Sequence, residues 1–338
     1  MKRLVTADWQ IDMGSMNRYR TDFVLSTLPA LREKHKPDQL LVLGDITEKK
    51  DAFQAPLVND IVGGFYELSK LCQIIILQGN HDFASIDYPF FKFLDCIDNI
   101  TWISVPTELD DCFYLPHTRD YGNWHSIIPE GCEFIFAHNI FTGVQANGGE
   151  LSGIPLSVLP VDSFCIAGDV HEPQMITDAK RDTSVLYVGS PILCDFGDSY
   201  HPRVLLLDGI KVKSIKVYGQ NKRLINVIWD KQAPNGGKDT YFDVGNALEG
   251  DIVKLQVHIG MEHVAKWPEI RQQVETWAID NKFVIHTIQP VVLYELGERQ
   301  KHIKSVRRSD SQYVDAFVKR SGIDPETSKV GHTILDMI

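Results

Sequence analysis

The sequence predicts an α/β fold with two domains, and three observations support this prediction. Over the first two thirds of the 338-residue chain, short apolar runs alternate with stretches of helical periodicity. Several of these runs are apolar throughout and lead directly into polar side chains. After about residue 210 the composition changes, and a shorter alternation of the same kind begins. A chain of this length also exceeds what one hydrophobic core usually serves.

The first three strands are expected at residues 4–7, 40–43 and 73–77, where the runs are short and apolar. Apolar residues at helical spacing separate them, around 23–31 and 57–68, which makes a β-α-β-α-β order. Strands that are apolar on both faces are typical of a sheet covered on both sides. Shorter connections later in this domain favour mixed or antiparallel pairing. The later elements are a helix near 90–94 and strands at 101–104, 112–115, 133–137, 164–167, 185–188 and 204–207.

The smaller domain is expected to combine several strands with one helix. The helix spans residues 267–281, with Pro268 near its first turn, where proline is well tolerated. The sequence Ala-Pro-Asn-Gly-Gly at 233–237 predicts a flexible loop. The strands are expected at 211–218, 224–229, 252–258 and 283–289.

The end of the chain is expected to form a helical tail. It carries Tyr313, Val314, Phe317 and Val318 at helical spacing and closes with an apolar cluster, so it packs on its own domain or docks on a partner. We therefore expect three parts, at 1–210, 211–300 and 301–338.

The composition is that of a soluble globular protein, with 43% hydrophobic and 23% charged residues. No run approaches the roughly 18 apolar residues that a membrane helix needs. The N-terminus passes straight into a strand without the apolar region of a signal peptide, so we expect a cytoplasmic protein and no membrane partner. The net charge of −11 disfavours a stand-alone nucleic-acid binder, although bound cations or a partner subunit can supply phosphate contacts.

Polar side chains follow the predicted strands where each strand ends. Because ligands of open α/β sheets bind at the carboxyl ends of the strands, we expect these side chains to meet. Carboxylate, imidazole and amide oxygen together suit Mn²⁺ or a related divalent ion, and the lack of thiolates argues against structural zinc. The candidate metal ligands are Asp8, Gln10, Asp45, Asn80, His138, Asp169 and His171.

Two divalent ions about 3.5–4 Å apart can clamp a phosphate and activate a water molecule. Asp45 is the natural bridge between them, and His81 is then free to protonate the leaving oxygen. Taken alone, Asp45 could be a turn residue, and Gly79–Asp82 could be a tight turn in which Asp82 caps a helix. The ordered set of strand-end segments favours the metal site. His117 has no assigned role and is expected at the surface or in a substrate groove.

At these residues the chain resembles the calcineurin-like metallophosphoesterase superfamily. That pattern runs Asp-x-His, Gly-Asp, Gly-Asn-His-Asp/Glu, His and Gly-His-x-His, and it extends over residues 1–210. The resemblance implies a four-layer α/β/β/α sandwich with a small α+β capping domain and the helical tail. Within the superfamily, Tyr187–Pro191 followed by Asp195 and Phe196 is most similar to the nuclease subunits of the SbcCD exonuclease family.

The resemblance implies a Mn²⁺-dependent DNA phosphodiesterase, an exonuclease and endonuclease of recombination and repair, with Mg²⁺ as the other candidate ion. Its expected partners are DNA and an SbcC-like coiled-coil ATPase that the tail contacts, in a heterotetramer containing a homodimer of this chain. The compartment is the cytoplasm, or the host cytoplasm for a phage protein. His81 is the implied proton donor. The implied ligand sets are Asp8, Gln10, Asp45 and His171 for one ion, and Asp45, Asn80, His138 and Asp169 for the other.

Three residues depart from the family pattern. Gln10 and Asp169 each stand where the pattern has a histidine, and Glu48 stands at a catalytic position where nucleases of this family carry one. Asp169 keeps a ligand and adds negative charge, which favours harder cations. An ionised Glu48 cannot donate a hydrogen bond to a phosphoryl oxygen. Two alternatives stay open: a phosphodiesterase or phosphatase acting on small nucleotides or phosphoproteins and, because of these departures, a pseudonuclease that acts as a scaffold for the ATPase.

Overall fold

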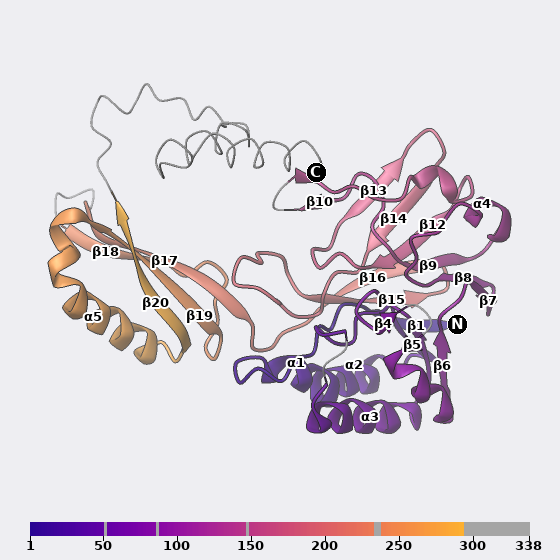
Figure 1. Ribbon diagram of the computed structural model, residues 1–338, viewed down its shortest axis with the longest axis horizontal. Helices are drawn as coiled ribbons and strands as arrows, with labels where there is room; N and C mark the ends of the chain where they lie inside the picture. The colour runs from indigo at the N-terminus through magenta and orange to yellow at the C-terminus, as the bar shows by residue number, and fades with distance from the viewer. Residues whose placement is uncertain (51–52, 86–87, 147–148, 233–237, 294–338) are drawn as a thin grey trace, which may run out of the picture. The chain divides into compact units, whose positions relative to one another are not determined.

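The computed structural model describes residues 1–50, 53–85, 88–146, 149–232 and 238–293 (Figure 1). Two six-stranded sheets dominate the first part of the chain. In the first sheet, four parallel strands are extended on one side by two antiparallel strands. Its order is β16 (Lys211–Lys216), β15 (Arg203–Asp208), β1 (Lys2–Thr6), β2 (Gln39–Val42), β3 (Gln73–Leu77) and β6 (Ile100–Ile103).

The second sheet also has a parallel centre, with one antiparallel strand at each edge. It is therefore the mixed sheet that the short connections predict. Its order is β13 (Met175–Asp178), β14 (Thr183–Tyr187), β12 (Phe164–Gly168), β9 (Phe134–His138), β8 (Cys112–Leu115) and β7 (Thr107–Leu109).

The two sheets pack face to face, because alternate side chains of their parallel strands point into a shared core. Val5 and Leu41 of the first sheet and Phe136 and Ile166 of the second belong to this core and are at most 1% exposed. The intervening residues, such as Leu4, point to the other face of the first sheet. Burial on both faces explains why these strands are apolar throughout.

Helices cover the outer face of the first sheet, and their apolar side chains form a second core with it. They are α1 (Arg18–Asp22), the π-helix η1 (Phe23–Thr27), α2 (Leu28–His35), α3 (Ala55–Ser69) and the 3-10 helix η2 (Phe90–Cys96). A third core lies on the outer face of the second sheet, under α4 (Trp124–Ile127), η3 (Leu156–Val158) and loops. The implied α/β/β/α order is thus confirmed, with a fourth layer built mainly of loops.

A separate four-stranded sheet follows, with α5 (Trp267–Asp280) beside it (Figure 1). Residues Ile270, Val274 and Ala278 of α5 are buried, and Trp277 stacks on Phe242 with ring centroids 3.8 Å apart. The sheet order is β18 (Lys238–Asp243), β17 (Lys222–Gln232), β19 (Ile252–Gly260) and β20 (Val284–Leu293), with η4 (Met261–Lys266) before α5. Two short strand pairs complete the description: β4 (Phe83–Ser85) with β5 (Tyr88–Pro89), and β10 (Gln145–Ala146) with β11 (Gly149–Glu150).

One sequence-based assignment is wrong. The strand expected at 211–218 in the smaller domain is β16, which pairs with β15 and extends the first sheet. The predicted loop at 233–237 and the predicted tail at 301–338 lie outside the described residues. Within the described ranges, no helix is both long and apolar enough to span a membrane.

Candidate metal centre

Five parallel strands, three in the first sheet and two in the second, place the predicted ligands at their carboxyl ends. The first sheet contributes the loops after β1, β2 and β3, and the second contributes the end of β9 and the loop after β12. The N–H of Asp8 donates to the Gly44 carbonyl (3.0 Å), and the N–H of Gln10 donates to the Asp45 carbonyl (3.1 Å). The N–H of Asp169 donates to Asp8 Oδ1 (3.0 Å), so the loops of the two sheets are tied together.

Four of these site residues have left-handed backbone conformations. The φ angles are +54° at Asp8, +47° at Gln10, +56° at Asp45 and +77° at Asp169. Aspartate enters this region more readily than most residues, whereas glutamine does so rarely. Such conformations cost roughly 1–3 kcal/mol each and persist where surrounding contacts hold them. Their concentration here is the pattern expected of a functional site.

Two glycines let the strand ends approach each other. A Cβ atom at Gly79 would lie 2.4 Å from Asp45 Oδ1, and one at Gly44 would lie 2.5 Å from His138 Nδ1. Neither distance can be accommodated, because the nearby atoms belong to the centre itself or to main chain. The glycines of Gly-Asp and Gly-Asn-His-Asp are therefore required by packing.

Asp8, Asp45 and His138 form a compact group of candidate ligands. One ligand atom from each lies within 4.8 Å of the others, and all three residues are buried. His138 Nδ1 lies 2.5 Å from the Leu43 carbonyl oxygen, which can only accept, so Nδ1 carries the proton. His138 Nε2 therefore faces the carboxylates, 3.2 Å from Asp45 Oδ1 and 3.8 Å from Asp169 Oδ1.

Three oxygens of the candidate ligands lack a hydrogen-bond partner. Among the buried side-chain atoms of the described residues, Asp8 Oδ2, Gln10 Oε1 and Asn80 Oδ1 have no hydrogen-bond partner. Leaving buried oxygens unsatisfied is costly, and bound divalent cations would satisfy them. The donor set of carboxylates, amide oxygens and imidazole fits the oxygen and nitrogen preference of Mn²⁺ or Mg²⁺. The residues present thus fit a divalent metal centre.

The pKa values at this centre reflect burial and close opposite charges. Burial, together with the neighbouring carboxylates, raises the pKa of Asp8 well above its usual value. Burial also acts to raise the pKa of Asp45, but His138 outweighs it and lowers that pKa to about 2. Burial acts to lower the pKa of His138, but Asp45, Asp169 and Asp8 outweigh it and raise that pKa. Protons on Asp8 and His138 therefore compete with cations.

The predicted proton donor, His81, is held at the edge of this group. Its Nδ1–H donates to the main-chain carbonyl of Glu48 (2.6 Å), and its main-chain N–H donates to Asp45 Oδ1 (2.9 Å). Because Nδ1 is hydrogen-bonded to the Glu48 carbonyl oxygen, Nε2 is the ring nitrogen that can exchange a proton. The side chain is only partly buried, so solvent can reach it.

Gln10 and Glu48 share a buried partner that the sequence pattern did not single out. Arg20 Nη1 donates to the Gln10 carbonyl (2.6 Å) and to Glu48 Oε2 (2.7 Å), and Nη2 donates to the Cys194 carbonyl (2.8 Å). Arg20 is 3% exposed, whereas the Glu48 side chain is 45% exposed. The Gln10 Nε2 donates to Asp45 Oδ2 (2.8 Å), which leaves its Oε1 for a cation. The predicted catalytic role of Glu48 stays a prediction.

Asp82 holds two of the loops together and caps no helix. Its Oδ2 accepts from the main-chain N–H of Gly79 (2.7 Å) and Asp45 (2.9 Å), and its Oδ1 accepts from Ile46 (2.9 Å). It is fully buried, and burial together with Asp45 raises its pKa to about 6. The helix-cap alternative is therefore wrong, because the carboxylate bonds to the loop after β2 instead.

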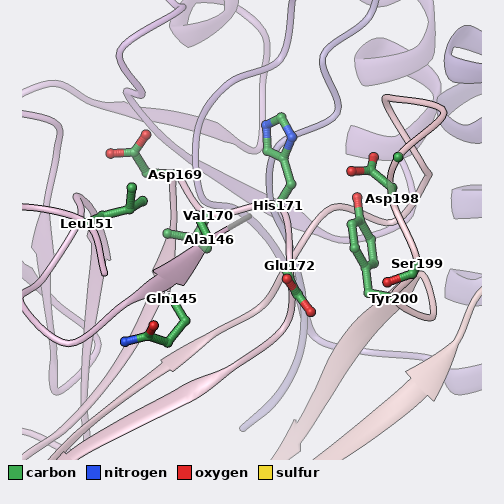
Figure 2. A pocket seen from close by; sticks show the side chains of 11 residues that line it. Gln145, Ala146, Leu151, Asp169, Val170, His171, Glu172, Asp198, Ser199 and Tyr200 are labelled. Atoms are coloured by element: carbon green, nitrogen blue, oxygen red, sulfur yellow. The ribbon is translucent and has the colours of Figure 1, made fainter. Parts of the chain in front are cut away.

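His171 lies apart from the group of three ligands. It lines a pocket of about 180 Å³ together with Asp169, Glu172, Asp198 and Tyr200. Figure 2 shows the side chains of Asp169, His171 and Asp198 around this pocket. Burial raises the pKa of Asp198, and the nearby His171 opposes that rise. The predicted role of His171 as a ligand stays a prediction.

His117, which the sequence left without a role, lies at the centre. Its ring centroid is 6.2 Å from that of His138, and its Nδ1 is 4.0 Å from Asp169 Oδ2. Burial and then His138 lower its pKa. No local motif marks this residue; the only sequence signal is its place after the strand at 112–115.

The comparison with sequence models of protein families identifies one family. A sequence model described as calcineurin-like phosphoesterase matches residues 1–286. No curated protein matches the chain significantly. Solved structures similar to the chain include the phosphoesterase YfcE of E. coli, at 13% identity over 62% of this chain and 88% of that one, with a TM-score of 0.34. Another is the nuclease MPE of Pseudomonas putida, at 17% identity, 63% and 87% coverage and a TM-score of 0.33. A dimetal phosphatase of Danio rerio has 12% identity, 64% and 99% coverage and a TM-score of 0.39.

Proposed function

Because the chain belongs to the calcineurin-like phosphoesterase family, we propose that it is a metal-dependent phosphodiesterase that cleaves DNA. The observation that carries the proposal is the meeting of buried Asp8, Asp45 and His138 with unpartnered amide oxygens at the carboxyl ends of the strands. A cation site of this kind and an acid for the leaving oxygen can together catalyse phosphodiester hydrolysis.

The proposed ligand sets follow the motifs in the sequence. Bound divalent ions would polarise a phosphoryl oxygen and lower the pKa of a coordinated water. Gln10 and Asp169 supply oxygens where the related pattern has imidazoles, which favours Mn²⁺ or Mg²⁺ over zinc. The sets are Asp8, Gln10, Asp45 and His171 for one ion, and Asp45, Asn80, His138 and Asp169 for the other.

His81 is the proposed general acid. As the water oxygen bonds to phosphorus and the bond from phosphorus to the 3′ oxygen breaks, the proton on His81 Nε2 passes to that oxygen. The Glu48 carbonyl fixes the ring for this transfer, because it holds Nδ1. Solvent then returns the proton, since the ring is only partly buried. Glu48 would thus act through its main chain.

DNA as substrate and an SbcC-like ATPase as partner rest on the resemblance to SbcCD-type nucleases. The small sheet with α5 supports this choice, because a phosphatase for small molecules needs no such domain. The net charge of −11 favours a partner that contributes phosphate contacts. The heterotetramer built on a homodimer of this chain rests on the same resemblance. The compartment would be the cytoplasm of the cell or of a phage host.

The test is cleavage of an end-labelled DNA duplex by the full chain with Mn²⁺, alone and with the ATPase. Wild type should release nucleotides, and His81→Ala should not. His125→Ala is the matched control, because His125 is exposed on α4 and takes no part in the proposed chemistry. Cleavage of bis-p-nitrophenyl phosphate but never of DNA would favour the small-substrate alternative. Equal inertness of wild type and His81→Ala on both substrates would favour the scaffold.

A further inference from the structure

His117 is held firmly beside the metal centre, although the proposed ligand sets give it no role. It follows β8, the neighbour of β9 in the second sheet. Its main-chain N–H donates to the carbonyl of Gln78 (2.9 Å), in the loop after β3. The N–H of Thr118 donates to Oδ1 of Asn139 (3.3 Å), directly after β9. The segment is therefore held between the loop that carries Asn80 and the residue that follows His138.

The nitrogen of His117 that faces inward is Nδ1. The side chain is 20% exposed, but Nδ1 itself is buried and has no hydrogen-bond partner among the residues that the structure describes. The centroid of the ring is 6.2 Å from that of Phe83 and 6.2 Å from that of His138. A substrate approaching from solvent would meet another part of the ring. A water molecule or a cation would satisfy a buried nitrogen that has no protein partner.

Asp169 lies between two imidazoles. Its Oδ1 is 3.8 Å from His138 Nε2, and its Oδ2 is 4.0 Å from His117 Nδ1. Both distances are too long for hydrogen bonds. Two ligand atoms that each lie about 2.1 Å from one cation are about 3–4 Å apart, depending on the angle between them. The 4.0 Å between His117 Nδ1 and Asp169 Oδ2 therefore suits two ligands of one cation, whereas the group whose ligand atoms all lie within 4.8 Å of one another is Asp8, Asp45 and His138.

We propose that His117 is a further metal ligand, which binds through Nδ1 the ion assigned to Asp45, Asn80, His138 and Asp169. The inference rests on the proposed function, since it assumes that a divalent ion occupies the centre. That ion would then have two imidazole ligands, one on each side of Asp169. Neutral imidazole nitrogen is a common ligand for first-row divalent ions, so the addition is chemically ordinary.

The test measures Mn²⁺ binding to the full chain by electron paramagnetic resonance, independently of catalysis. His117→Leu removes the nitrogen, whereas His117→Gln keeps a polar group that can reach the ion through oxygen. His125→Gln is the control, because it changes an exposed histidine on α4. Pulsed resonance on protein with ¹⁵N-labelled histidine counts the imidazoles bound to Mn²⁺. Circular dichroism verifies that each variant is folded.

Wild type and His125→Gln should each bind two Mn²⁺ ions, and the two proteins should have the same Kd at each site. In His117→Leu, one of the two sites should weaken about tenfold or more. His117→Gln should retain more affinity than His117→Leu but lose one imidazole coupling. Unchanged affinities and an unchanged number of couplings in folded His117 variants would overturn the inference and leave the proposed function intact. Failure of the wild type to bind Mn²⁺ would overturn both.

Discussion

His81 donates its Nδ1–H to the main-chain carbonyl oxygen of Glu48 across 2.6 Å. This bond selects the ring nitrogen that stays free and connects the Gly-Asn-His-Asp loop to the loop after β2. Since the acceptor is main chain, the identity of the side chain at position 48 does not decide the orientation of His81. A glutamate there is therefore compatible with a working acid.

Replacing His81 with alanine should remove the acid and leave the metal ligands in place. We expect kcat for DNA cleavage to fall about 10²–10⁴-fold, the usual contribution of a general acid. The Kd for Mn²⁺ should stay within about threefold, because His81 supplies no metal ligand. Steady-state kinetics and calorimetric titration measure the two quantities.

Glu48→Gln is the matched comparison, because it keeps the carbonyl that holds His81. Its kcat should fall by less than tenfold, well short of the general-acid range that His81→Ala is expected to reach. A loss equal to that of His81→Ala would show that the Glu48 carboxylate, and not its carbonyl, matters for the reaction.

Asp82→Asn should loosen the loops that carry Asp45 and Asn80. The Asp82 carboxylate accepts three main-chain hydrogen bonds, whereas the asparagine amide turns an N–H₂ group toward at least one of those donors. The free energy of unfolding of the metal-free protein should fall by about 1–3 kcal/mol. Urea unfolding measures it, with the exposed Asp120→Asn as control. Equal stability of the two variants would contradict this assignment.

Gly79→Ala should damage the centre by steric overlap. The added methyl group would lie 2.4 Å from Asp45 Oδ1, so either that carboxylate or the loop must move. Overpacking of this kind costs about 1–3 kcal/mol, and Mn²⁺ binding should weaken with it. Gly63→Ala is the control, because a Cβ there meets nothing within 4 Å and lies inside α3. That change should stabilise the protein by about 0.5–1 kcal/mol. Equal Mn²⁺ affinities in the two variants would contradict the steric argument.

Affinity for Mn²⁺ should rise with pH. The pKa values of Asp8 and His138 are raised in the metal-free protein, so both groups keep their protons to a higher pH than usual, and these protons compete with a cation. Each displaced proton adds up to about a tenfold gain in affinity per pH unit, below the pKa of its group. Asp45, whose pKa is lowered to about 2, stays ionised and adds nothing to the pH dependence of the Mn²⁺ affinity. Calorimetry in buffers of different ionisation enthalpy counts the released protons, and binding without proton release would contradict this account.

Local sequence patterns predict much of the fold and most of the side chains of the candidate metal centre. The apolar runs at 40–43 and 73–77 correspond to β2 and β3 within one residue, because strands buried on both faces need apolar side chains throughout. The polar residues that follow such strands can be recognised in the sequence for the same reason. They interrupt an apolar run at a place where the topology brings strand ends together.

Pairing between distant segments could not be read in this way. The strand at 211–216 carries lysines and looks like the start of a new domain, yet it completes the edge of the first sheet beside β15. Arg20 and His117 reach the centre through contacts with residues far away in the sequence. Neither residue sits in a motif, so only the folded chain brings them to the site.

The most direct test of the account is anomalous scattering from crystals of the full chain soaked in Mn²⁺. We predict two peaks about 3.5–4 Å apart on either side of Asp45. One should lie beside Asp8 Oδ2 and Gln10 Oε1, and the other beside Asn80 Oδ1 and His138 Nε2. Strong Mn²⁺ peaks elsewhere, with none beside Asp45, would contradict the assignment of this centre as the metal site.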